Sequence, residues 1–173
     1  MTNYNLISEA ILKQAKEKGW GHDVDTFDVA RKMLLIQTEI TEVQEILIDG
    51  KQNLLEKDSL ECELADIVIR CLHLGAVYKV DFDKSLLETN LSLPDFKNTQ
   101  EVLLRLYKEV SMGFEGYRHK EMEQFLRCPV SIIQIVLGWA QELGVDIQQA
   151  ITLKSDINAG RSWDHGKKSE EAK

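Results

Sequence analysis

Apolar side chains recur every three to four positions along almost the whole chain, and only two prolines interrupt them. This is the period of amphipathic helices, and no stretch shows the alternation that a strand requires. We predict helices over residues 4–18, 26–48, 58–78, 83–90, 100–117, 129–143 and 146–159. Gly19 would end the first helix, and Asp25 or Thr26 would cap the second. The predicted fold class is therefore all-α, with residues 91–99 as the best candidate linker.

The two halves of the chain resemble each other weakly. Residues 64–81 and 129–146 both show an apolar helix, a bend, Val-Asp and a further helix, and Thr38-Glu-Ile-Thr can be aligned with Lys108-Glu-Val-Ser. We predict one domain over residues 1–168, with a first half at about 26–92, a degenerate second half at about 99–165, and a disordered tail at 169–173. Two unrelated amphipathic helix pairs would produce a similar pattern, so both interpretations stay open.

The predicted helix over residues 58–78 carries one narrow polar stripe on an otherwise apolar surface. Glu63, Asp66, Arg70 and His73 follow one another at spacings of three, four and three, which places them on one side of the helix. The remaining positions are apolar enough for the helix to be largely buried. A buried carboxylate is costly unless it is paired or binds a metal, so Glu63 and Asp66 are candidate metal ligands. His73 would either hydrogen-bond one of them or be a satisfied core histidine.

Glu39 and Glu42 repeat the three-residue spacing on the preceding helix. Two antiparallel helices can direct both pairs to one point, where four carboxylates would repel one another unless cations lay between them. Oxygen ligands suit Mg²⁺ or Mn²⁺ better than Zn²⁺, and four negative charges suffice for two divalent ions. A di-iron bundle would need Glu-x-x-His pairs, which the sequence does not contain. Each pair taken alone is more often a solvated helix face.

The formal net charge of -8 restricts the possible partners. It argues against non-specific binding to nucleic acid, and a polyphosphate substrate would need metal ions or a local basic cluster. Such a cluster begins with Lys154, Asn158 and Arg161, which share one face of a helix, and continues through His165 and Lys168. The alternative is a helix C-terminus with favourable cations and no ligand.

No signal peptide and no apolar run of about 20 residues is visible in the sequence. The three cysteines, Cys62, Cys71 and Cys128, form no CxxC pair. We therefore expect a cytoplasmic protein with reduced cysteines in its core, and neither a membrane nor a nucleic acid as partner.

The four carboxylates also resemble a known motif. Glu39-x-x-Glu42, twenty intervening residues and Glu63-x-x-Asp66 match the defining pattern of the all-α nucleoside triphosphate pyrophosphohydrolases, which include MazG-like enzymes and dimeric dUTPases. The resemblance implies a MazG-like helical bundle that binds Mg²⁺ through these carboxylates, with Mn²⁺ as a possible substitute. It further implies hydrolysis of a (deoxy)nucleoside triphosphate to the monophosphate and pyrophosphate.

The segment over residues 154–168 resembles the late substrate-binding motif of the same enzymes, so that the two matches frame most of the chain. The resemblance implies phosphate contacts for Lys154, Asn158 and Arg161, together with His165 and Lys168. There are departures from the family pattern. Thr38 stands where MazG enzymes usually carry an acidic residue.

The second half departs further from the carboxylate motif. Met112, Cys128 and Ser131 stand where Glu42, Glu63 and Asp66 would repeat. This half cannot bind metal in the same way, and it resembles the degenerate partner in the fused arrangement of dimeric dUTPases.

The implied reaction uses a water that the metal activates for in-line attack on phosphorus, with Glu39 or Glu42 orienting the water. Gln37 and either Trp20 or Trp163 could contact the base, although Trp163 could equally be a buried anchor. A fused pair of helical modules could act alone, but apolar faces left over on such bundles favour a homodimer.

Two other functions fit the same residues. One is a metal-dependent phosphohydrolase acting on a modified or non-nucleotide pyrophosphate. The other is a non-catalytic helical interaction module whose carboxylates are only a surface.

Overall fold

A computed structural model describes residues 2–50 and 59–160 of the protein. Within these residues it contains seven helices and no strand, which confirms the predicted all-α class. The helices are α1 (Tyr4–Lys18), α2 (Val29–Leu47), α3 (Leu60–Val77), α4 (Phe82–Glu88), α5 (Thr99–His119), α6 (Met122–Leu143) and α7 (Ile147–Gly160).

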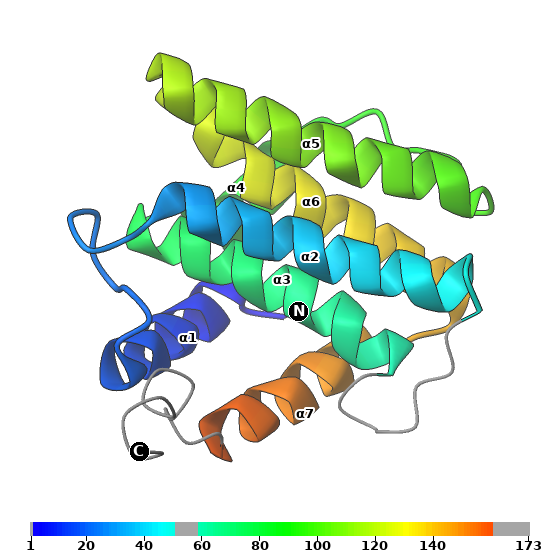
Figure 1. The fold of residues 1–173 in the computed structure, drawn as a ribbon, viewed down its shortest axis with the longest axis horizontal. Helices are drawn as coiled ribbons and strands as arrows, with labels where there is room; N and C mark the ends of the chain where they lie inside the picture. Colours follow the sequence, from blue (N-terminus) through cyan, green and yellow to red (C-terminus); the bar gives the residue numbers. More distant parts are fainter. Residues whose placement is uncertain (1, 51–58, 161–173) are drawn as a thin grey trace, which may run out of the picture.

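Helix α3 lies at the centre of the bundle and packs against α1, α2, α6 and α7 (Figure 1). Helices α5 and α6 form a closely packed pair on one side, and α1 and α7 lie on the other. The apolar side chains of α3 explain its place, since Leu64, Ile67 and Leu72 are fully buried. Elements from both halves of the chain therefore surround the helix that carries the polar stripe.

Helix α2 begins at Val29 rather than at residue 26, so the predicted cap at Asp25 or Thr26 is wrong. Thr26 belongs to a separate turn, in which its backbone N and its Oγ1 both donate to Oδ1 of Asp23 at 2.9 Å. The carboxylate of Asp28 caps the helix instead by accepting from the Arg31 backbone N at 3.0 Å.

Helix α6 begins at Met122, seven positions before the predicted start at Pro129, which lies inside the helix. An interior proline removes one helical hydrogen bond and costs about 3 kcal/mol. Burial of Phe125 and Cys128 in the turns before it offsets this cost. Close packing on α5 permits that burial, since a Cβ on Gly113 would lie 2.5 Å from Sγ of Cys128.

The three cysteines are free and buried, as the sequence predicts. Among the described residues, no single helix has both the length and the apolar character needed to cross a membrane. The pair α6 and α7 reaches that threshold only when taken together, and it is bent by 112°.

Candidate metal centre

Three of the four predicted ligands converge between α2 and α3. One carboxylate oxygen from each of Glu39, Glu63 and Asp66 can be chosen so that all three lie within 4.8 Å of one another. The residues are only 5%, 5% and 7% exposed, respectively. These three carboxylates, here called the acidic triad, could hold a metal ion.

The packing of α2 on α3 brings the triad together. Ile36, Ile40 and Val43 form a fully buried stripe on α2, and Glu39 lies beside that stripe. Because Glu63 and Asp66 are one turn apart on α3, both can face the same point on α2. Helix α7 packs against α3 as well and contributes to the burial of the site.

Glu42 is half-buried and lies at the edge of the acidic triad. Its side chain interacts with Glu39 and Glu63.

Two cations of the protein also contact the acidic triad. Arg70 donates from Nε at 2.9 Å and from Nη2 at 2.8 Å to the same oxygen, Oε1 of Glu39. Nζ of Lys154, on α7, lies 2.8 Å from Oδ2 of Asp66, and this lysine is only 2% exposed. The predicted contact of Lys154 with phosphate stays a prediction, since its ammonium group lies on a carboxylate here.

Burial and repulsion from neighbouring carboxylates raise the pKa values of Glu39 and Glu63. Burial raises the pKa of Glu39 to about 7, Arg70 opposes this rise, and the charge of Asp66 and the hydrogen bond with Glu42 add to it. Burial likewise raises the pKa of Glu63, against the effect of Lys154. For Lys154, burial disfavours the charged form, but the hydrogen bond and charge of Asp66, with the charge of Glu63, outweigh it and raise its pKa.

The donor set fits a hard divalent cation. All of its ligand atoms are carboxylate oxygens, which suit Mg²⁺, Ca²⁺ or Mn²⁺, and no His or Cys belongs to the group among the described residues. A divalent ion would relieve the repulsion between the acids.

His73 points away from the acidic triad. Its Nε2 lies 2.8 Å from the Gly21 carbonyl oxygen, and its ring packs edge-on against Phe27 with centroids 5.2 Å apart. Burial lowers the pKa of His73 to about 4, and the nearby cations Lys32 and Arg70 add to this effect. His73 is therefore a satisfied core histidine and not a hydrogen-bond partner of the ligands.

The other predicted site residues are spread more widely. Gln37 is exposed on α2, and Asn158 is half-buried one turn beyond Lys154 on α7. Trp20 is half-buried, and its backbone oxygen accepts from Nζ of Lys32 at 2.6 Å. Three predicted phosphate contacts and one candidate base contact lie outside the described residues, namely Arg161, His165, Lys168 and Trp163.

The structure adds Arg70 to the site, a residue to which the sequence pattern assigns no function. The signal was present, because Arg70 follows Asp66 by one turn on the polar stripe. The contact of Arg70 with Glu39 on α2 could not be predicted from that spacing, because the spacing of residues within one helix does not show which helix packs against it.

The second half contains a simpler arrangement at the corresponding position. Glu109 is buried, like Glu39, and its Oε1 lies 2.9 Å from Nε of Arg105. Cys128 and Ser131 are buried and uncharged. No further group of three potential metal ligands surrounds Glu109 within the described part of the chain.

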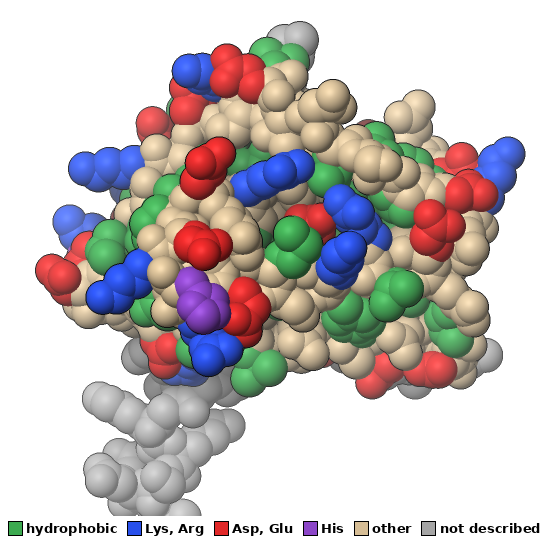
Figure 2. Space-filling model, turned by 90° about the horizontal axis from the view of Figure 1, so that it is seen from above, with side chains coloured by type: hydrophobic (Ala, Val, Ile, Leu, Met, Phe, Trp, Pro, Cys, Tyr) green, Lys and Arg blue, Asp and Glu red, His purple; other side chains and the backbone are tan. Residues whose placement is uncertain are grey.

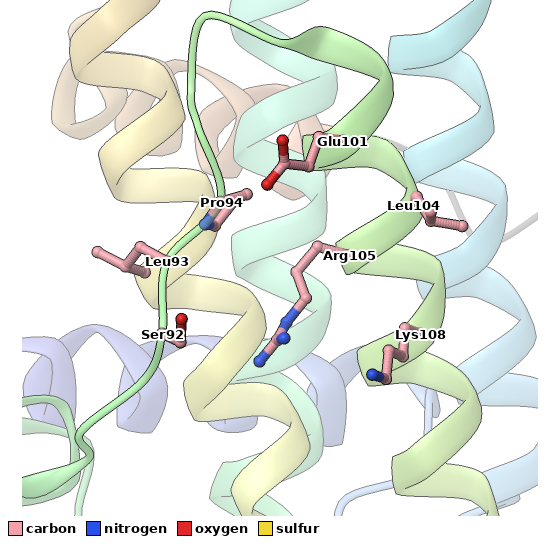
Figure 3. Close-up of a pocket in the computed structure, with 7 residues that line it drawn as sticks. All are labelled: Ser92, Leu93, Pro94, Glu101, Leu104, Arg105 and Lys108. Carbon is pink, nitrogen blue, oxygen red and sulfur yellow. The ribbon is translucent and has the colours of Figure 1, made fainter.

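The cavities found beside α5 do not include the acidic triad. One of about 240 Å³ lies between α5 and the segment before it, where Arg105 and Lys108 extend toward Ser92 (Figure 3). Another, of about 550 Å³, lies between α5 and the start of α6 and also includes Arg105. Figure 2, which looks onto the α5 side, shows acidic and basic side chains interspersed there rather than one basic patch.

No family model, characterised protein or solved structure matches this chain. The case for its chemistry therefore depends on the residues themselves.

Proposed function

We propose that this protein is a Mg²⁺-dependent nucleoside triphosphate pyrophosphohydrolase that converts a (d)NTP into a (d)NMP and pyrophosphate, with Mn²⁺ as an alternative ion. The observation that carries the proposal is the convergence of Glu39, Glu63 and Asp66 in a buried position between two helices. Buried acids in such numbers destabilise a fold unless cations neutralise them. The motif formed by the same residues supports the choice of reaction.

A bound divalent ion would supply a Lewis acid for the phosphate oxygens and would lower the pKa of a nearby water. The acidic triad would hold the ion. Glu42 is half-buried, whereas the other three carboxylates are buried. Glu42 is therefore the carboxylate that we propose accepts the proton from the attacking water.

The overall acidity of the protein requires basic groups near the substrate. Arg70 is suited to this role because its side chain is 35% exposed while its guanidinium is held by Glu39. We propose that, besides Arg70, the phosphates contact Lys154, Asn158, Arg161, His165 and Lys168. The proposed contact to the base is Gln37. We further propose a cytoplasmic homodimer.

The test is release of pyrophosphate from a panel of nucleotides with Mg²⁺, measured separately from release of orthophosphate. Glu63→Gln and Asp66→Asn should each lower the rate by at least about 100-fold. Mutation of residues that only hydrogen-bond the ligands of a metal already lowers metal affinity or activity by about 10- to 100-fold. Glu109→Gln is the matched control, because it removes a buried carboxylate paired with an arginine in the second half.

Wild-type activity in Glu63→Gln or Asp66→Asn would rule out the proposal. Hydrolysis of non-nucleotide pyrophosphates alone would replace the nucleotide substrate with another pyrophosphate. Absence of both hydrolysis and Mg²⁺ binding would favour the interaction module.

A further inference from the structure

Two cations of the protein already neutralise part of the negative charge of the acidic triad. Lys154 reaches it from α7, in the other half of the chain, and forms a buried ion pair with Oδ2 of Asp66. Arg70 pairs with Oε1 of Glu39 from within α3. Two protein cations are therefore already part of the site.

The charges of these groups determine how many divalent ions are needed to neutralise the site. Glu39, Glu42, Glu63 and Asp66 carry four negative charges when fully ionised, and Arg70 and Lys154 contribute two positive charges. The remaining two negative charges match one divalent ion. A second ion would give the buried site a positive excess, which is unfavourable in a low-dielectric environment.

The carboxylate oxygens that already contact Lys154 or Arg70 also favour a single divalent ion. Oδ2 of Asp66 is in contact with an ammonium group, and Oε1 of Glu39 accepts two guanidinium hydrogen bonds. An ion that bridged through either oxygen would have to displace a hydrogen-bonded cation. Lys154 is the more firmly placed of the two cations, because it is only 2% exposed.

We propose that, in the absence of nucleotide, the site takes one divalent cation per chain and that the ammonium group of Lys154 occupies the place of a second. This inference rests on the proposed metal-dependent function. It specifies the stoichiometry of that site and makes Lys154 a positioning residue for Asp66.

The experiment is a titration of the full-length, metal-free protein with Mn²⁺, without nucleotide, in which free Mn²⁺ is followed by electron paramagnetic resonance. We expect one bound ion per chain in the wild type. Lys154→Met should raise the number to two, because Oδ2 of Asp66 is then no longer in contact with an ammonium group and becomes available to a second ion. Lys154→Arg keeps the cation and should keep the number at one.

Two ions bound to the wild type would overturn the inference while leaving the proposed function intact. One ion bound to a folded Lys154→Met variant would also overturn it. No bound ion in the wild type would overturn the metal-dependent function itself, together with this inference. The number of Mn²⁺ ions bound to the wild type tests the proposed stoichiometry even if the Lys154→Met variant does not fold.

Discussion

Nζ of Lys154 lies 2.8 Å from Oδ2 of Asp66, so that a lysine on α7 forms a buried ion pair with a carboxylate on the central helix α3. The contact connects the two halves of the chain at the acidic triad. It makes the stability of the bundle depend on the charge state of the proposed metal site.

Lys154→Met should destabilise the metal-free protein. It leaves Asp66 buried without its cation, and breaking a buried pair from one side costs about 3–5 kcal/mol. Urea unfolding in the presence of EDTA measures this change. The double variant Lys154→Met with Asp66→Asn should lose less, because it no longer buries an unpaired charge. A single-variant loss below about 1 kcal/mol would show that the pair behaves like an exposed one.

Mg²⁺ should stabilise the folded protein through the acidic triad. At about 100 times the dissociation constant, an ion that binds only the folded state adds about 2.7 kcal/mol to the free energy of unfolding. Glu63→Gln should lose this gain, whereas Glu109→Gln should keep it because Glu109 pairs with Arg105. Urea unfolding with and without Mg²⁺ gives the comparison. If Mg²⁺ raised the free energy of unfolding equally in both variants, the ion would bind at a site other than the acidic triad.

His73 should make stability depend on pH below neutrality. Its pKa of about 4 in the folded protein lies below the ordinary 6.5. Between these values the unfolded chain binds a proton that the folded protein does not, so the free energy of unfolding falls as pH falls. A difference of about 2.5 pH units corresponds to a loss of up to about 3 kcal/mol.

The variant His73→Gln isolates this contribution, because a glutamine amide can still donate toward the Gly21 carbonyl but does not titrate. Unfolding curves between pH 7 and 4 should show a smaller loss for the variant than for the wild type. Parallel pH profiles for the two proteins would show that His73 does not carry the effect.

Gly113→Ala should destabilise the contact between α5 and α6. The added Cβ would lie 2.5 Å from Cβ and Sγ of Cys128, so one of the two helices must shift, at a cost of about 1–3 kcal/mol. Gly160→Ala is the control, since no atom of the described residues lies within 4 Å of the added Cβ. Thermal unfolding of both variants tests the difference, and similar midpoints would contradict the observed packing.

Local sequence signals determined most of the helices. The sequence predicts the first helix at its observed bounds, because a glycine ends a helix at low cost, and Gly19 indeed adopts the left-handed conformation. The same rules failed where local signals competed with burial. Pro129 suggested a helix start, but the buried side chains of Phe125 and Cys128 extend α6 toward the N-terminus.

The spacing of Glu39, Glu63 and Asp66 was enough to place each residue on a particular helix face, because an α-helix has a fixed period. Only the tertiary structure decided what meets that face. Arg70 could have contacted several neighbours, and Lys154 could have faced solvent. The packing of α2 and α7 on α3, driven by apolar burial along the whole bundle, placed the two cations on Glu39 and Asp66.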